Sequence, residues 1–180
     1  MGHLGNARIV MQLYIGFGDI VVPSAAQIEY PAMLDMPAPR LLGYSRESTV
    51  AEKFEAMAKL GARNSRMKDF FDIWLLSRQF DFNGNTLAEA VKKTFAARGT
   101  TIPPQPFVFA DELKADPAKI TQWRGFIRKS RIENALREFG DVIDAVTDFL
   151  GPVADVLSSG KLFEGRWQAP GPWRTSKTKR

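Results

Sequence analysis

The sequence predicts an α+β fold in which a small sheet near the N-terminus is followed by a mostly helical body. Between residues 8 and 17, apolar side chains occupy every second position, which is the pattern of a half-buried strand. From Glu47 onward, apolar side chains recur every three or four residues, which is the spacing of an amphipathic helix. Strands therefore come first and helices follow, and this order argues against an alternating α/β architecture.

Two strands are expected in the N-terminal region. The first ends where Gly16 and Gly18 bend the chain, and its alternating apolar residues are Ile9, Met11, Leu13 and Ile15. The second is expected at Arg40–Tyr44, because three prolines exclude a helix from the residues before it: Pro31, Pro37 and Pro39. The sheet is therefore small.

The first two helices follow at once. One begins near Glu47, with Gly61 as a typical stop signal, and its buried stripe consists of Val50, Phe54 and Met57. Ser65 can cap the next helix, which should end before the turn-like residues 83–85. The apolar face of this second helix is predicted to carry Phe70, Ile73, Trp74 and Ser77.

Thr86 can cap a third helix that runs through Ala97 and ends at Gly99. A proline-rich loop then covers residues 102–106.

Pro117 suits the first turn of a fourth helix, which should end near Lys129. Residues 134–158 form a long helical segment in which an interruption is expected at residues 151–152, because glycine and proline stand there together. Its apolar positions include Val142, Val146, Phe149 and Val153. The aromatic, glycine-rich and proline-rich stretch after Gly160 is expected to pack without regular structure.

Composition excludes several kinds of chemistry. The chain has no cysteine, which excludes disulfides, zinc–thiolate sites and thiol nucleophiles. Its single histidine, His3, cannot support a Ser/His/Asp triad or a multi-histidine metal site. Any catalysis must therefore use carboxylates, lysines, arginines or hydroxyls. The lack of cysteine fits a cytoplasmic location, and no apolar stretch approaches the roughly 20 residues that span a membrane.

The basic balance of the chain is concentrated at its end. The formal net charge is +5, and four positive charges lie in the last seven residues: Arg174, Lys177, Lys179 and Arg180. The remaining chain is therefore close to neutral, so the basic composition is weak evidence for a nucleic-acid-binding face.

Three segments have sequence motifs typical of one protein family. Residues 15–19 read Ile-Gly-Phe-Gly-Asp, residues 46–57 read Arg-Glu-Ser-Thr-Val-Ala-Glu-Lys-Phe-Glu-Ala-Met, and residues 64–74 read Asn-Ser-Arg-Met-Lys-Asp-Phe-Phe-Asp-Ile-Trp. Together with Phe-Glu-Gly-Arg-Trp at 163–167 and Gly-Pro-Trp at 171–173, they resemble the nucleotidyltransferase toxins of the AbiEii/AbiGii family. The resemblance covers nearly the whole chain.

This resemblance implies a polymerase-beta-like nucleotidyltransferase fold with a small mixed sheet. It also implies transfer of a nucleotide from a nucleoside triphosphate, with Mg²⁺, to an acceptor such as tRNA. Such proteins are toxins of toxin/antitoxin or phage abortive-infection systems, so an antitoxin partner is expected. The chain then divides into a partial nucleotidyltransferase sheet at 1–45, a helical body at 46–160 and an irregular tail with a basic end at 161–180.

The chain also departs from the family pattern. Full-length members carry a Gly-Ser motif and an Asp-x-Asp pair upstream of the present start, and these supply the main metal ligands. A further acidic position of the family corresponds to Tyr14 here. The chain therefore reads as the C-terminal two-thirds of a family member, and we expect weak activity or none.

Lys53 is the candidate cation for the phosphates. It borders the buried stripe of its helix, so it could extend from that edge into a cleft. From the pattern alone, a lysine whose stem covers the helix shoulder is the commoner interpretation. The resemblance favours the catalytic role, because the Glu-Lys pair at 52–53 matches the active-site lysine motif of the family.

Asp69 and Asp72 are the candidate catalytic carboxylates. Their i, i+3 spacing places both on one side of a helix near its N-terminus, where the helix dipole favours ionised carboxylates. They could act as the base for an acceptor hydroxyl or as an anchor for Lys53. The alternative is an acidic first turn that only stabilises the helix. The resemblance assigns the catalytic position to Asp69 first.

Three further residues complete the predicted site. Arg66 and Lys68, with Lys53, could bind the triphosphate, although solvated charges at a helix end explain them equally well. Asp19 follows a Gly-x-Gly bend and is either a metal ligand or a turn-stabilising aspartate. The competing function for the whole chain is a non-catalytic helical interaction module.

Overall fold

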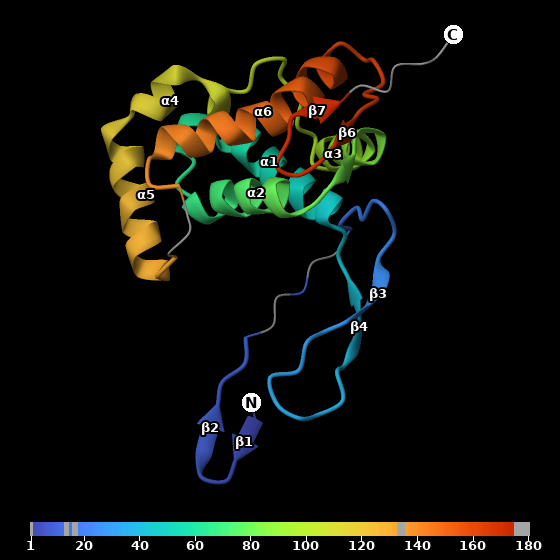
Figure 1. The fold of residues 1–180 in the computed structure, drawn as a ribbon, viewed down its shortest axis with the longest axis vertical. Coiled ribbons are helices and arrows are strands. Elements are labelled where there is room, and N and C mark those ends of the chain that lie inside the picture. The colour runs from blue at the N-terminus through green and yellow to red at the C-terminus, as the bar shows by residue number, and fades with distance from the viewer. Residues whose placement is uncertain (1, 13–14, 16–17, 133–135, 175–180) are drawn as a thin grey trace.

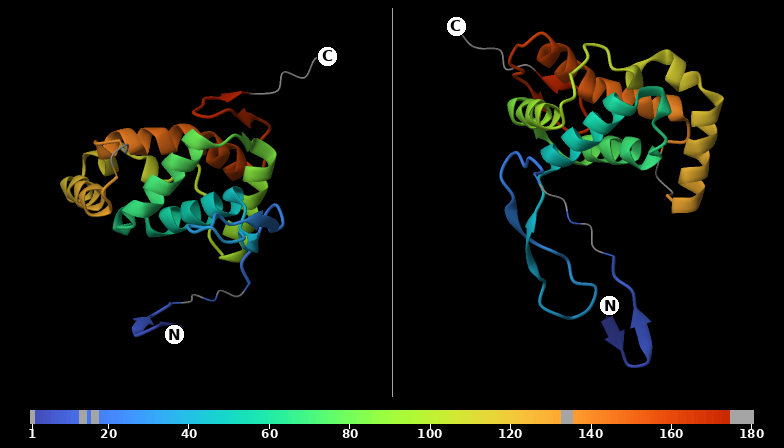
Figure 2. Two further views of the ribbon diagram at one scale, coloured as in Figure 1. Left: turned by 60° about the horizontal axis from the view of Figure 1, so that its bottom comes forward. Right: turned by 180° about the vertical axis from the view of Figure 1, so that it is seen from behind.

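The computed structural model describes residues 2–12, 15, 18–132 and 136–174. A helical body forms the larger part, and two β-hairpins project away from it (Figures 1 and 2). The predicted α+β fold with a mostly helical body is confirmed. The described strands form three small sheets, and every described strand pair is antiparallel.

Two hairpins lie near the N-terminus, at residues 2–9 and 26–43, and the strand side chains of described exposure are mostly exposed to solvent. Strand β1 (Gly2–Leu4) pairs with β2 (Ala7–Ile9), and β3 (Ala26–Glu29) pairs with β4 (Arg40–Gly43). Strand β4 confirms the second predicted strand. The first predicted strand is confirmed only at its start, because β2 ends at Ile9; residues 13, 14, 16 and 17 lie outside the described residues. The alternating pattern thus continues beyond the strand into exposed chain.

Helices α1 (Arg46–Leu60) and α2 (Met67–Gln79) begin the helical body, joined by a short 3-10 helix, η1 (Gly61–Arg63). Their predicted apolar faces are buried. The predicted cap of α2 at Ser65 is wrong, because Arg66 holds that position. The cause is Asn64, the residue before Ser65. Its Oδ1 accepts a hydrogen bond from the Arg66 backbone N–H and turns the chain there.

Helix α3 (Gly84–Ala97) follows directly from a two-residue strand, β5 (Phe82–Asn83). The predicted cap at Thr86 is wrong, because Asn83 caps the helix: its Oδ1 accepts a hydrogen bond from the Thr86 backbone N–H at 3.1 Å. The first residue of the helix, Gly84, has to be a glycine, because a Cβ there would lie 2.8 Å from the Gly165 carbonyl oxygen.

The remaining helices are η2 (Phe107–Phe109), α4 (Asp111–Ala115), α5 (Pro117–Ser130) and α6 (Phe139–Ser158). The fourth predicted helix is confirmed as α5, which Asp116 caps and Pro117 begins. The predicted interruption of α6 at residues 151–152 is wrong, because the helix continues through both. Proline inside a helix costs about 3 kcal/mol, and the fully buried side chains around it outweigh that cost: Val146, Phe149, Leu150 and Val153. No helix of the described residues is long and apolar enough to cross a membrane.

The C-terminal stretch, expected to be irregular, contains two short strands. Strands β6 (Arg166–Trp167) and β7 (Trp173–Arg174) extend β5 into a three-stranded sheet. Two tryptophans anchor this sheet to the helices, because Trp167 Nε1 donates to the Ser77 carbonyl at 2.6 Å and Trp173 Nε1 donates to the Phe149 carbonyl at 2.8 Å. The sheet is therefore part of the core rather than a loose tail.

Candidate functional site

Lys53 lies between two carboxylates where α1 packs against α2. Its Nζ donates a hydrogen bond to Asp69 Oδ1 at 2.8 Å and lies 2.8 Å from Asp72 Oδ2. The Lys68 ammonium lies 2.6 Å from the same Asp72 oxygen. The structure thus brings together Lys53, Asp69 and Asp72, the three residues that the sequence placed in one site, in an alternating row of two cations and two carboxylates.

The packing of the two helices explains this convergence. Phe54 and Met57 of α1, and Phe70 and Ile73 of α2, are buried in the shared core. Lys53 stands beside the buried stripe of α1, so its stem runs along the interface and its ammonium emerges at the edge. The first turns of α2 present their acidic side chains at that edge. The sequence pattern on each helix therefore determines the meeting point.

The cluster is mostly withdrawn from solvent. The side chains of Lys53, Asp69 and Asp72 are 20%, 14% and 18% exposed. Burial by itself lowers the pKa of Lys53, but the hydrogen bonds and negative charges of Asp69 and Asp72 outweigh it and raise the pKa above its ordinary value. Lys53 is therefore a permanent cation at neutral pH, and it is positioned by its partners.

A cavity of about 630 Å³ opens beside this cluster, between the N-terminal end of α2 and helix α5. Helix α5 lies across that end of α2 (Figure 1). Asp69 connects the cavity with the Lys53 cluster. Three cations and one carboxylate line it, so its net charge favours an anion; the lining residues are Ser65, Arg66, Met67, Lys68, Asp69, Gln122, Gly125, Phe126 and Lys129.

Gly125 stands in the middle of α5, where glycine costs about 1 kcal/mol relative to alanine. No neighbouring atom lies within 4 Å of the position that its Cβ would occupy, so packing against another element does not require glycine. Its φ is not among the positive values of the chain. What the missing side chain does provide is open space in the cavity.

Lys119 and Asn64 fix the position of α2 relative to α5. Lys119 is only 6% exposed, and its Nζ donates to the Asn64 carbonyl oxygen at 2.6 Å. Asn64 is also buried, and its side chain turns the chain into α2 through the Arg66 backbone N–H. This bond holds the two walls of the cavity together.

Asp19 lies in a different cluster from Lys53. Its Oδ1 is 4.0 Å from the Arg98 guanidinium, which also reaches Glu52 at 3.6 Å and the buried Glu55 at 3.0 Å. Burial and the charges of Glu52 and Asp19 raise the pKa of Tyr44 to about 12. These contacts tie the segment before α1 to the end of α3. Asp19 as a metal ligand stays a prediction from the sequence.

The described residues do not form a metal site by themselves. Within residues 2–12, 15, 18–132 and 136–174, no three His, Cys, Asp or Glu side chains are grouped to hold a metal ion. Asp69 and Asp72 face lysine ammonium groups instead. Tyr14, the expected departure from the family pattern, lies outside the described residues.

Sequence reasoning missed the contribution of α5 to the cavity. The second wall of the cavity is formed by four residues of α5: Gln122, Gly125, Phe126 and Lys129. They lie more than 50 positions after Asp69, so no local pattern links them to it. One signal was present, because a glycine in the middle of an amphipathic helix is unfavourable and calls for a packing or access reason.

The comparisons with known proteins agree with the resemblance in the sequence. The sequence profile of the family described as "Nucleotidyl transferase AbiEii toxin, Type IV TA system" matches residues 2–145. No curated protein and no solved structure matches the chain significantly. Since the profile covers well over half of the 180 residues, the chain belongs to the AbiEii nucleotidyl transferase toxin family.

Proposed function

We propose that this chain binds a nucleoside triphosphate in the cavity between α2 and α5 and transfers its nucleotide to an acceptor, with tRNA as the acceptor. The observation that carries the proposal is the convergence of Lys53 with Asp69 and Asp72 at the edge of a cavity lined by Arg66, Lys68 and Lys129. Phosphoryl transfer depends on positioning and on cations placed around the phosphates, and this arrangement supplies both.

In the proposed reaction an acceptor hydroxyl oxygen attacks the α-phosphorus of the triphosphate. The new P–O bond forms as the bond to the leaving pyrophosphate breaks, and the hydroxyl proton passes to a base. Asp69 is the base, because it lines the cavity and pairs with Lys53 alone among the described residues, whereas Asp72 lies between Lys53 and Lys68. Lys53 contributes a fixed positive charge beside the phosphates.

Divalent metal use is general among nucleotidyltransferases, and Mg²⁺ is the expected ion. Because the described residues do not group three metal ligands, we derive no step through the ion. For the same reason we propose that transfer by this chain is slow. Loss of one preorganised charge-stabilising group commonly costs a factor of about 100 or more in rate.

Family membership places the chain among toxins of toxin–antitoxin systems, so we further propose a cognate antitoxin as its partner. Activity in an abortive-infection response to phage and residence in the cytoplasm belong to the same proposal.

The test is nucleotide incorporation. Purified chain is incubated with each labelled nucleoside triphosphate, Mg²⁺ or Mn²⁺, and total tRNA, beside Lys53→Ala, Asp69→Ala and the matched surface control Lys92→Ala. We expect slow incorporation by the parent and by the control, with a loss of at least about 100-fold in the other two variants. Incorporation that survives both substitutions would refute the site, and a chain that neither binds triphosphate nor incorporates label would favour a non-catalytic interaction module.

A further inference from the structure

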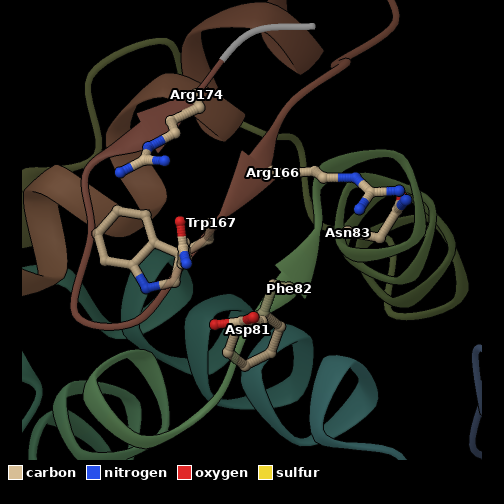
Figure 3. Close-up of a pocket in the computed structure, with 7 residues that line it drawn as sticks. Asp81, Phe82, Asn83, Arg166, Trp167 and Arg174 are labelled. Carbon is tan, nitrogen blue, oxygen red and sulfur yellow. The ribbon is translucent and has the colours of Figure 1, made fainter.

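A second cavity, of about 570 Å³, lies on the outer side of the three-stranded sheet (Figure 3). The register pairs Phe82 with Trp167 and Trp167 with Trp173, and these aromatic residues pack toward the helices. Neighbouring residues of a strand point to opposite faces. The other row of the register, Asn83, Arg166 and Arg174, therefore faces the cavity.

Arg166 and Arg174 stand directly opposite each other on paired strands. Like charges in that position destabilise a sheet. Among the described residues neither arginine has a carboxylate within ion-pairing distance, and both side chains are exposed. The one acid that lines the cavity, Asp81, instead accepts a hydrogen bond from the Ala169 backbone N–H at 2.9 Å. The two guanidinium groups are thus left for an external anion.

The direction of the two side chains indicates how many anionic groups the cavity can hold. Figure 3 shows Arg166 extending toward Asn83 and helix α3, whereas Arg174 extends over Trp167. The guanidinium groups therefore point apart rather than toward one shared point. Such spacing fits a ligand that carries repeated negative charges better than it fits one isolated phosphate.

Neutral donors complete this cavity. Asn83 uses its Oδ1 to cap α3, so its amide N–H groups can donate to a ligand. Gln168 also lines the cavity, and the N-terminus of the 14-residue helix α3 adds positive potential next to Arg166. The surface thus combines two arginines, two amides and a helix N-terminus, a set of groups that proteins commonly use to contact the phosphates of nucleic acids.

The cavity is separate from the Lys53 cluster, and helix α1 connects the two. Arg46, the first residue of α1, lies with its guanidinium carbon 5.6 Å from the centre of the Phe82 ring, on the helix side of the strand whose other residue, Asn83, faces the cavity. Lys53 follows seven residues later on the same helix, about 10 Å further along. A polymer bound at Arg166 and Arg174 could therefore extend toward the proposed site of transfer.

We infer that Arg166 and Arg174, with Asn83 and Gln168, bind the phosphodiester backbone of the acceptor RNA at a subsite distinct from the triphosphate cavity. The identification of the ligand as RNA rests on the proposed function, whereas the unpaired arginine row does not. Arginine recognises phosphate through several donors, so each guanidinium holds one phosphate group.

The test compares three proteins for binding of a labelled single-stranded RNA and of total tRNA over a range of salt concentrations. These are the parent, Arg166→Gln/Arg174→Gln, and the charge-matched control Arg40→Gln/Lys92→Gln, whose sites are exposed and lie on β4 and α3. We expect the arginine variant to bind RNA at least about 10-fold more weakly and its salt slope to fall by about 1.4, for two lost phosphate contacts. The control loses less than half of that effect.

Two further arms separate the alternatives. An Arg166→Lys/Arg174→Lys variant keeps the charge and should keep most of the binding, which would show that positive charge at these two positions sets the affinity for RNA. Polyglutamate tests whether the cavity takes an acidic protein, and inorganic triphosphate tests whether it takes a free phosphate compound. Polyglutamate or triphosphate binding that depends on both arginines as strongly as RNA binding does would overturn the assignment, as would RNA binding that is equal in the parent and the glutamine variant.

The outcome does not depend on that of the incorporation test. The Arg166→Gln/Arg174→Gln variant is expected to bind nucleoside triphosphate as the parent does, and Lys53→Ala is expected to bind RNA as the parent does. Failure of the proposed function would remove triphosphate binding and leave RNA binding intact. Failure of the present inference would leave RNA binding unchanged by the arginine substitutions.

Discussion

At the scale of single residues, Lys53 combines a structural and a chemical role in one ammonium group. Its two carboxylate partners neutralise it in the free protein, so a phosphate that enters must share the ammonium with Asp69 and Asp72. Its raised pKa also has a consequence for stability. The contribution of Lys53 to the free energy of unfolding is complete below pH 10.5, which is the ordinary pKa of lysine. It is lost as the pH rises through the higher pKa that Lys53 has in the folded protein.

Tyr44 gives the clearest prediction of pH dependence. Its pKa is raised from 10.0 to about 12, so between these pH values the unfolded chain loses the phenol proton and the folded chain keeps it. Stability should therefore decline as the pH rises across this window, and Tyr44→Phe should flatten the decline. An ultraviolet titration of the phenolates should show a step near pH 12 that Tyr44→Phe removes and Glu52→Gln shifts downward. Titration of Tyr44 at its ordinary pKa would contradict the proximity of Glu52 and Asp19.

At the scale of elements, the connection between α2 and α5 depends on one buried lysine. Lys119→Met removes the donor to the Asn64 carbonyl oxygen and leaves that oxygen buried without a partner. We expect a loss of about 1–3 kcal/mol in the free energy of unfolding, measured by urea denaturation. Lys129→Met, at the exposed end of the same helix, is the control and should change stability by less than about 0.5 kcal/mol. Equal effects of the two substitutions would show that the buried bond has no special weight.

Elements could be predicted where the local pattern and the final packing agree. Helix α1 is such a case, because Val50, Phe54 and Met57 mark its buried face and Gly61 its end. Helix α6 is the opposite case: a local rule predicts a break at Pro152, and burial against the rest of the core overrides it. The caps of α2 and α3 were misplaced because an asparagine side chain near each predicted cap accepts the backbone N–H bond instead. Asn64 turns the chain so that the cap position of α2 falls at Arg66, and Asn83 itself caps α3.

At the scale of the whole molecule, the helical body and the C-terminal sheet share one core. Residues 2–9 form a hairpin of their own, and the described side chains of β2 are exposed. Removing residues 2–9 should therefore change the Tm by less than about 2 °C, measured by circular dichroism. A large fall in Tm on removing the hairpin would mean that it stabilises the helical body.

Trp167→Ala removes a buried ring from the centre of the sheet contacts and should lower the free energy of unfolding by about 3–5 kcal/mol.

The candidate site was only partly predictable, because part of it forms only when the whole helical body packs together. Lys53, Asp69 and Asp72 lie on consecutive helices, so their periodicity already places them on faces that meet. Helix α5 reaches the same site only through the packing of the body, and nothing in the local pattern of Gln122 or Lys129 marks them as cavity residues. Asp19, which the sequence also assigned to the site, instead joins the Arg98 cluster.

The central claim is that a nucleoside triphosphate binds in the cavity between α2 and α5. Its most direct test measures binding by titrating variants of Gly125 with each nucleoside triphosphate. Because nothing lies within 4 Å of the Cβ position, a side chain can leave the backbone there without a clash. Gly125→Phe then places a ring in the cavity between α2 and α5, and Gly125→Ala adds one methyl group and about 1 kcal/mol of helix stability. We predict that the parent and Gly125→Ala bind triphosphate with similar affinity and that Gly125→Phe, still folded, binds at least about 10-fold more weakly. Binding by Gly125→Phe that equals that of the parent would show that the triphosphate lies elsewhere.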